Sequence, residues 1–420
     1  MCQIIIRAEE LVQPEIEMIK ENINKLILEY EGYANRCVNL IASENYPSPA
    51  VRKALSSTLV GKYAEGYPGK RYYAGNLIVD KIELQIQDLA RTAFNTNYYV
   101  NVQAHSGSIA NQAILDGLLK PSDKILSLKL SHGGHLSHGA PVSITGHSFD
   151  VINYEVNSKT GKINYEQVES LAIKHQPKII ICGFTSYPYS VDFARFAKIA
   201  KKTNSLLLAD ISHIVALIIS GAHTSPFNYA DVVMTTTHKS LCGPRGALIF
   251  SKNKEISDAV DKAVFPYIQG GPHLHSIASI GIALQETLKP SFNTYARNII
   301  DNLQAIIAVF DKKKIIHSGS ENHLLLLDTK KSFDLTGDKA QEMLEKINIL
   351  VNKNALHLDV SVLHPSGIRI GTPAMTKRGM KAKQMETIAQ TIIECLRQEP
   401  KNVNNLSSRV TDLATKFPIH

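Results

Sequence analysis

The stretch that decides how this chain folds is Asp231-Val-Val-Met-Thr-Thr-Thr-His-Lys-Ser-Leu-Cys-Gly-Pro-Arg-Gly-Ala-Leu-Ile-Phe250. An apolar, β-branched run at 232–236 leads to Lys239, and a second apolar run at 247–250 follows a turn that contains glycine and proline. Runs of this kind, bounded by Gly and Pro, are typical of strands joined by a turn. The pattern predicts a lysine held where two strand ends and a loop meet.

A lysine in that position is suited to form a Schiff base with an aldehyde, because burial and nearby cations lower the pKa of its amine. The aldehyde that we expect is pyridoxal phosphate. The residues before the lysine could bind a phosphate or a ring oxygen; they are Thr235, Thr236, Thr237 and His238. A solvated turn residue is the commoner role of an isolated loop lysine, and at this point that alternative stays open.

The bulk composition indicates an ordinary globular protein with two domains. A chain of 420 residues exceeds the ~250 to 300 residues at which single cores stop growing. It has 44% hydrophobic and 20% charged residues, and its net charge of +8 comes from scattered lysines. Because no basic stripe is interleaved with aromatic residues, we expect no nucleic-acid partner. A mild positive charge would suit an anionic substrate or cofactor.

The cysteines and the N-terminus bear on location. The five cysteines are far apart and include no Cys-x-x-Cys pair, which argues against a disulfide framework or a zinc site; they are Cys2, Cys37, Cys182, Cys242 and Cys395. The apolar run Ile4 to Ile6 is too short for a signal peptide. No stretch approaches the ~18 apolar residues of a membrane span. We therefore expect a cytoplasmic protein with no membrane segment.

Apolar segments alternate with helical patterns between residues 98 and 250. Strands are expected at 98–102, 124–130, 178–183, 206–210, 232–236 and 247–250, and one of the intervening helices at 192–203. This alternation predicts an α/β fold with a parallel or mixed sheet. In such sheets the functional site lies beyond the carboxyl ends of the strands.

Three regions are expected along the chain. Apolar residues at three- and four-residue spacing in 8–30 predict a helix, so 1–35 is assigned to an N-terminal helical arm. Residues 36–288 form the large cofactor-binding domain. Residues 289–420 form a small α+β domain, with helices near 295–310, 337–347 and 381–398 and strands at 323–328 and 367–371. We expect the polar C-terminal stretch, 401–420, to fray.

Asp210 and Arg369 are candidate binding residues with competing explanations. Asp210 ends an apolar run, and a carboxylate under a pyridine nitrogen would keep that nitrogen protonated, as the cofactor requires; it could equally be a helix N-cap. Arg369 lies mid-strand in Ser-Gly-Ile-Arg-Ile-Gly. A buried guanidinium is costly unless it meets an anion, which could be a substrate carboxylate or a structural Asp or Glu.

Two glycine-containing segments are candidate cofactor contacts. Ser106-Gly-Ser108 opens an apparent helix, so its backbone N–H groups could bind a phosphate, although an ordinary helix cap is the alternative. The segment 132–138 has the histidine density of a metal site but no acidic or cysteine partner nearby. We expect one of its histidines to stack on a flat ring, and we expect no metal.

Taken together, these segments closely resemble the serine hydroxymethyltransferases, a family of fold-type I pyridoxal-phosphate enzymes in the aspartate aminotransferase superfamily. The matching runs span nearly the whole chain, at 40–45, 62–73, 101–108, 132–139, 209–214, 236–246, 269–272, 321–323 and 366–374. The resemblance implies a large domain with a mostly parallel seven-stranded sheet and a smaller α+β C-terminal domain. It also implies reversible conversion of serine and tetrahydrofolate to glycine and methylenetetrahydrofolate by a homodimer or homotetramer.

The resemblance implies roles for individual residues. Lys239 matches the lysine that carries the cofactor, Asp210 the partner of its pyridine nitrogen, and His135 the stacked histidine. Further cofactor contacts match Ser106, Gly107, Ser108, Thr185, His213, Thr236 and His238, while Tyr63, Gly270 and Gly271 match positions that reach the neighbouring subunit's cofactor phosphate. Ser43, Glu65, Tyr73 and Arg369 match substrate contacts, with Glu65 as the carboxyl group that handles protons. Leu130, Gly134, Leu136 and Asn354 match folate contacts. The expected catalytic set is Lys239, Glu65, His135, Asp210 and Tyr73.

The sequence also departs from the family pattern. The departures are Ala104, Thr185, Tyr189, Ser240, Cys242, Ala247 and Tyr267, and the segment 354–366 is about one residue short. They leave the lysine chemistry intact and bear on folate affinity and subunit packing. Two other functions are considered: a folate-independent aldolase or transaldolase acting on β-hydroxy amino acids, and a poorly catalytic homologue that binds a partner or RNA.

Overall fold

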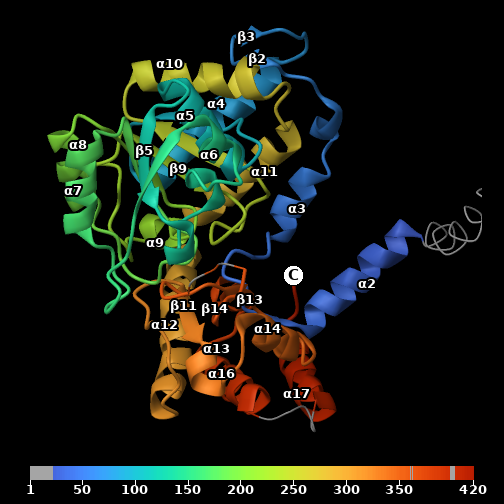
Figure 1. Ribbon diagram of the computed structural model, residues 1–420. Coiled ribbons are helices and arrows are strands. Elements are labelled where there is room, and N and C mark those ends of the chain that lie inside the picture. The colour runs from blue at the N-terminus through green and yellow to red at the C-terminus, as the bar shows by residue number, and fades with distance from the viewer. Residues whose placement is uncertain (1–21, 360, 362, 398–402) are drawn as a thin grey trace, which may run out of the picture.

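The computed structural model describes residues 22–359, 361, 363–397 and 403–420. Figure 1 shows a large sheet covered by helices, with a second group of helices and short strands beneath it. None of the helices in the described part of the chain has the length and apolar character needed to cross a membrane.

Within the described residues the large sheet has seven strands, in the order β4-β10-β9-β8-β7-β5-β6. Their bounds are β4 Tyr99–Asn101, β5 Lys124–Leu128, β6 Asp150–Tyr154, β7 Ile179–Gly183, β8 Leu206–Asp210, β9 Val232–Thr236 and β10 Ala247–Ser251. The pairs are parallel apart from those of β10, which runs antiparallel to β9 and β4. The predicted mostly parallel α/β fold is confirmed.

Helices bury both faces of this sheet, and this explains why its central strands are continuous apolar runs. Ile179 and Ile181 of β7 pack in one core with α5 (Gly107–Leu118) and α10 (Lys254–Lys262). Ile180 and Cys182, on the alternate face, pack in the other core. The helices of that face are α4 (Leu77–Phe94), α7 (Tyr165–His175), α8 (Phe193–Lys202), α9 (Val215–Ile219) and α11 (Leu274–Thr287).

The edge strand β6 was not predicted. Among the described strands it pairs with β5 alone, and in its sequence Asp-Val-Ile-Asn-Tyr only Tyr154 is fully buried. An edge strand with polar positions lacks the apolar run by which the central strands were found.

A separate core holds the C-terminal part of the chain. Its elements are α12 (Pro290–Lys312), β11 (Leu324–Asp328), α13 (Thr329–Phe333), α14 (Gly337–Glu345), β12 (Ile349–Leu350), β13 (Asn352–Asn354), β14 (Gly367–Gly371), α15 (Pro373–Lys377), α16 (Ala382–Arg397) and α17 (Val403–Thr415). Val38 and Leu40 belong to this core although they precede the large sheet in sequence, because β1 (Val38–Asn39) pairs with β12. At the other boundary, Phe292 and Ala296 of α12 pack with the large sheet.

The two ends of the chain differ from the predicted pattern. Helix α2 covers Ile23–Arg36, so it extends beyond the predicted end at 30, and the predicted part before residue 22 lies outside the described residues. The expected fraying of 401–420 is wrong for the described part, because α17 buries Leu406, Val410 and Ala414 at four-residue spacing in the small-domain core.

The remaining elements are short. They are α3 (Pro49–Leu55), η1 (Thr58–Gly61), β2 (Gly66–Tyr67), β3 (Lys70–Arg71), η2 (Leu130–His132), η3 (Leu136–His138), α6 (Ile144–Ser148) and η4 (Ala263–Ile268). The hairpin formed by β2 and β3 lies at the top of Figure 1, at the opposite end of the large domain from β14.

Candidate active site

Lys239 lies just beyond the end of β9 and is only 8% exposed. Its burial excludes the interpretation as a solvated turn residue. Burial, together with the charges of Arg369 and Arg245, lowers the pKa of Lys239 to about 8, although Asp210 acts in the opposite direction. Its ammonium group makes no ion pair or hydrogen bond with the described residues. A buried amine with a lowered pKa is a nucleophile at neutral pH.

Asp210, at the end of β8, is an ionised carboxylate with partners on both oxygens. Its Oδ2 accepts hydrogen bonds from Nε2 of His138 (2.9 Å) and Nδ2 of Asn111 (3.1 Å), while Oδ1 accepts one from the backbone N–H of Ser212 (3.1 Å). Burial alone would raise the pKa of Asp210, but the His138 hydrogen bond and the nearby positive charges, including Lys239, hold it well below its ordinary value. The bond to Ser212 does not cap a helix, because the N-cap residue of α9 is Ile214. The alternative role of Asp210 as a helix N-cap is therefore wrong.

A hydrogen-bond relay that was not predicted connects His135 to Asp210. The N–H and the hydroxyl of Ser137 both bond Nδ1 of His135, at 3.1 and 2.8 Å, and Nδ2 of Asn111 donates to the Ser137 hydroxyl at 2.9 Å. His135 is thus neutral with its proton on Nε2, and burial lowers its pKa to about 4. In the sequence, His138 was a signal for this relay because it lies in the same histidine segment as His135. For Asn111, one turn into α5, the sequence offered only its proximity to Ser106–Ser108.

The N-terminus of α5 faces β9. The Ser106 hydroxyl caps the helix by accepting from the N–H of Ile109 (3.4 Å), and a Cβ on Gly107 would lie 2.5 Å from Cγ2 of Thr236. Nearby, the hydroxyl of Thr236 and Nδ1 of His238 are buried and have no hydrogen-bond partner among the described residues. A helix N-terminus next to unpartnered buried polar atoms is suited to an anion.

Arg369 on β14 is 5% exposed and faces the large domain. It donates to Oδ1 of Asn352 (3.0 Å), to the Thr185 carbonyl (2.7 Å) and to the Ser43 hydroxyl (3.4 Å). Within the described part of the chain no carboxylate pairs with it, so the alternative of a structural Asp or Glu partner is wrong there. Burial lowers its pKa to about 10, and a buried guanidinium without an anion is suited to bind one from solution.

His213 lies behind Asp210 and meets a histidine of the small domain. Its Nδ1 is 3.1 Å from Nε2 of His323, and burial lowers the pKa of both rings, that of His323 to about 3. The backbone carbonyl of Thr185 binds Arg369, and its hydroxyl is buried with no hydrogen-bond partner in the described part of the chain. His213, Thr185 and Asp210 line one small cavity, which places these predicted residues together.

Other predicted residues form a second group. The rings of Tyr63 and Tyr73 are 5.0 Å apart, and Cβ atoms on Gly271 and Gly270 would lie 3.4 Å from the Tyr63 ring and from Oε1 of Glu65, respectively. No hydrogen bond, ion pair or ring contact in the described residues joins this group to Lys239. Glu65 directly precedes β2, at the far end of the large domain from β14 (Figure 1).

A cavity of about 530 Å³ lies between the two domains, and none of the four predicted folate positions is among the described residues that line it. Leu136 is 49% exposed, and a Cβ on Gly134 would come within 2.1 Å of the Leu128 carbonyl. The cavity is lined by residues adjacent in sequence to Leu130, Gly134 and Asn354, namely Ser131, His132, Gly133 and Ala355.

Each histidine of the segment 132–138 contacts another group of the chain. His132 accepts from the N–H of Val156 (3.2 Å), His138 binds Asp210 and His135 binds Ser137. Among the described residues no group of three or more His, Cys, Asp or Glu could hold a metal ion.

Comparisons with known proteins agree with this geometry. The family model for serine hydroxymethyltransferase matches residues 16–392. The chain is 43% identical to the serine hydroxymethyltransferase of Prochlorococcus marinus over 97% of this chain and 96% of the relative. It is 44% identical to that of Coprothermobacter proteolyticus over 92% and 93%, and 43% identical to a probable serine hydroxymethyltransferase of Mesomycoplasma hyopneumoniae over 96% and 98%. The chain therefore belongs to the serine hydroxymethyltransferase family of fold-type I pyridoxal-phosphate enzymes.

Proposed function

We propose that this chain interconverts L-serine plus tetrahydrofolate and glycine plus 5,10-methylenetetrahydrofolate, with pyridoxal phosphate bound covalently to Lys239. The observation that carries the proposal is a buried amine of lowered pKa beside an ionised buried carboxylate in a chain of this family. The charges of Lys239 and Asp210 shift each other's pKa, which supports their binding one small molecule.

The residues around Lys239 fit pyridoxal phosphate. Ser106, Gly107 and Ser108 at the start of α5, with the unpartnered Thr236 hydroxyl and His238, would bind the phosphate. Asp210 would hold a proton on the pyridine nitrogen, and the flat, neutral ring of His135 would cover the ring face. Thr185 would donate to the phenolic oxygen. When bound, the cofactor supplies an electron-withdrawing ring that accepts the electron pair of a breaking carbon–carbon bond.

Arg369 would orient the amino acid. Its Nη2 already donates to the Ser43 hydroxyl, and the planar guanidinium fork matches a carboxylate bidentately. Fixing the carboxylate at this point of the small domain fixes which bond of the substrate stands across the ring. His213, held by His323, would lie beside the cofactor.

Glu65 and Tyr73 would serve the site of a second copy of the chain, which makes the enzyme at least a homodimer. They lie apart from Lys239 within one chain, and large hydrophobic side chains are exposed on their loop (Tyr63 56%, Tyr72 77% and Tyr73 46%) and at the start of α4 (Leu77 82%). Glu65 would take the proton from the side-chain hydroxyl of serine and return it in the reverse direction, while Tyr63, Gly270 and Gly271 would reach the phosphate. A tetramer would add a second interface.

We also propose a folate site and a cellular location. Leu130, Gly134, Leu136 and Asn354 would contact the folate, close to the interdomain cavity. The domain limits 1–35, 36–288 and 289–420 would be refined by moving Val38, Leu40 and the start of α12 to the cores in which they pack. A cytoplasmic location is supported by four described cysteines that are all unpaired.

The test compares two reactions of the purified protein. We expect serine turnover to require tetrahydrofolate and to exceed the folate-independent cleavage of threonine or phenylserine. Serine turnover that is indifferent to folate would instead establish the aldolase or transaldolase. A protein that develops no visible absorbance with added pyridoxal phosphate would exclude both.

A further inference from the structure

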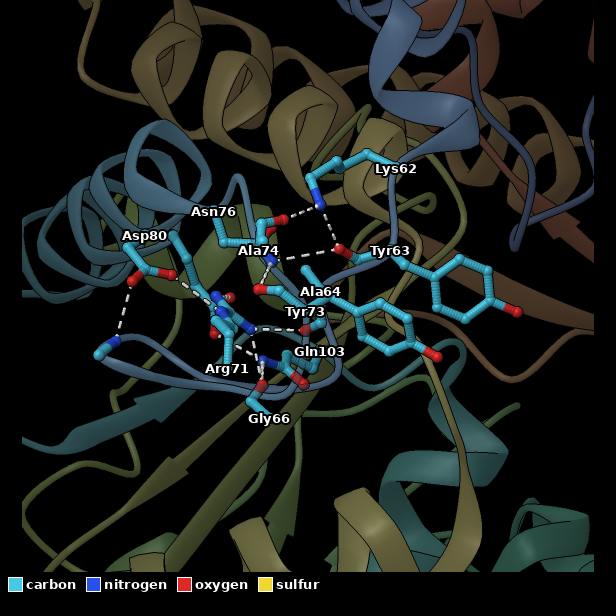
Figure 2. A network of polar contacts seen from close by, with 12 residues as sticks. Lys62, Tyr63, Ala64, Gly66, Arg71, Tyr73, Ala74, Asn76, Asp80 and Gln103 are labelled. Carbon is cyan, nitrogen blue, oxygen red and sulfur yellow. Dashed lines mark hydrogen bonds and ion pairs between the residues drawn. The ribbon is translucent and has the colours of Figure 1, made fainter.

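The loop that carries Tyr63, Glu65 and Tyr73 is tied together at its two ends (Figure 2). The ammonium group of Lys62 donates to the carbonyls of Tyr63 (2.7 Å) and Ala74 (2.9 Å). The side-chain amide of Asn76 donates to the carbonyls of Tyr73 (2.8 Å) and Tyr63 (3.3 Å). The loop is therefore closed at its base, and its shape depends on what fixes its middle.

Arg71 fixes the backbone on both sides of Glu65 (Figure 2). Its Nη1 donates to the carbonyl of Ala64 at 2.8 Å and to the carbonyl of Gly66 at 2.6 Å. The neighbouring N–H of Tyr72 donates to the carbonyl of Glu65 itself at 3.0 Å. Three successive carbonyls are thus bound by Arg71 of β3 and by Tyr72, the residue after it. The peptide planes on both sides of the Glu65 side chain therefore cannot rotate freely.

The guanidinium of Arg71 is in turn fixed by helix α4. Its Nε donates to Oδ1 of Asp80 (2.8 Å) and its Nη2 to Oε2 of Glu83 (2.5 Å). The side chains of Arg71 and Glu83 are 4% and 1% exposed. Burial alone would lower the pKa of Arg71, but the two carboxylates more than offset it, so its pKa lies above the ordinary value. A charged, planar fork held from a helix is a rigid support.

Gln103 connects the same cluster to the large sheet. It lies two residues after the end of β4, and its amide donates to the carbonyl of Gly66 (3.1 Å) and to Oε1 of Glu83 (2.8 Å). By contrast, the carboxylate of Glu65 accepts no hydrogen bond and forms no ion pair within the described residues. The backbone of Glu65 is held firmly while its carboxyl group remains available.

We propose that Arg71 is a positioning residue for the reaction, which presents the Glu65 carboxyl group at a fixed place to the active site it serves. The inference rests on the proposed function, which assigns proton transfer to Glu65. Lysine cannot replace arginine here, because one ammonium group cannot span two carbonyls and two carboxylates at once. A displacement of about 1 Å at a proton-transferring group is enough to cost about 100-fold in rate.

The test is a double-mutant cycle on the cofactor-loaded enzyme with Arg71→Lys, Glu65→Gln and the double variant. We expect Arg71→Lys to lower kcat for serine and tetrahydrofolate about 10- to 100-fold, with KM for serine nearly unchanged because Arg369 is untouched. In the Glu65→Gln background Arg71→Lys should cause little further loss, since both changes remove the same function.

Arg378→Lys is the matched control. Arg378 is also a buried arginine that binds backbone carbonyls, those of Cys37 (2.8 Å), Asn35 (2.8 Å) and Ala414 (2.7 Å), but it lies in the small domain. Any loss it causes should multiply with that of Glu65→Gln. If the losses of Arg71→Lys and Glu65→Gln also multiply, Arg71 supports the fold alone and the inference is wrong. If Glu65→Gln leaves serine turnover unchanged, the role of Glu65 in the proposed function is what fails.

A structural readout completes the test. Hydrogen–deuterium exchange of the 63–74 peptide should rise in Arg71→Lys and not in Arg378→Lys, whereas equal exchange in both would contradict the inference. Should Arg71→Lys not fold, Gln103→Leu removes the second donor to Gly66 at similar volume. It should show a smaller kcat loss with the same lack of further loss in the Glu65→Gln background, and multiplying losses would again contradict the positioning role.

Discussion

Arg71 and Arg369 are both buried arginines, yet their surroundings differ. Arg71 meets two carboxylates and two carbonyls of its own chain. Arg369 meets an amide, a carbonyl and a hydroxyl, and no carboxylate among the described residues. Because a buried charge without a partner is costly, we infer that Arg71 stabilises the fold, whereas the role proposed for Arg369 is to bind an anion from outside the chain.

The largest expected effect is on activity at Arg369. We expect Arg369→Met to lower kcat/KM for serine roughly a thousandfold, equivalent to about 4 kcal/mol, because the bidentate grip on the carboxylate is lost. Steady-state kinetics measures this, and binding of the cofactor, followed by its visible absorbance, serves as the control. A loss below about tenfold would mean that Arg369 has another task.

The same substitution at Arg71 should act on stability. Arg71→Met leaves the buried Glu83 and the partly exposed Asp80 without their cation, and breaking a buried pair such as that with Glu83 costs about 3 kcal/mol or more. Scanning calorimetry should therefore show a midpoint several degrees lower than that of the wild type. Arg369→Met removes an unpaired charge and should leave the midpoint equal or higher. Equal destabilisation by both substitutions would contradict the inference that Arg71 stabilises the fold and Arg369 does not.

A smaller effect, with a defined pH dependence, is expected at Lys239 in the cofactor-free protein. The folded state lowers the pKa of this amine from 10.5 to about 8. Protonation of this amine therefore disfavours the folded state. The free-energy cost is absent above the unfolded pKa and grows, as the pH falls through about 8, to about 3 kcal/mol. Lys239→Met should therefore be more stable than the cofactor-free wild type at pH 7. The advantage should shrink at alkaline pH; an advantage that grows with pH would contradict it.

The smallest effect is expected at an exposed ion pair. Arg409 and Glu394 are 2.8 Å apart, with side chains 46% and 35% exposed. Arg409→Ala should change the thermal midpoint by less than about 1 °C, because solvent and salt screen such pairs. A shift as large as that of Arg71→Met would show that burial does not explain why the ion pairs of Arg71 stabilise the protein more than the exposed pair of Arg409.

The sequence predicted the parts of the fold whose residues obey one local rule. Central strands such as β7 and β8 are buried on both faces and appear as apolar runs, whereas the edge strand β6 is interrupted by Asp150 and Asn153 and was missed. Helix α17 was taken for a frayed end, because its polar face hid the four-residue spacing of its buried residues.

The site residues that could be predicted are likewise those that a local sequence pattern marks. Lys239, Asp210 and Arg369 stand at strand ends or mid-strand, where their chemistry is conspicuous. The residues that contact them were missed, because those contacts depend on three-dimensional packing. Asn111 and His138, for example, bind Asp210 from other elements. The structural role of Arg71 was not predicted, because this residue lies in a segment rich in tyrosine and glycine. The available signal was the pair Asp80 and Glu83, three residues apart on the helix that follows the loop.

The covalent site is the claim on which the rest depends, and borohydride reduction tests it most directly. Reduction of the purified enzyme loaded with pyridoxal phosphate fixes the cofactor to the amine that holds it, and peptide mass mapping then locates that amine. We predict a single modified peptide containing Lys239, absent from Lys239→Met. Modification of a different lysine, or of none in an enzyme that turns over serine, would contradict the account.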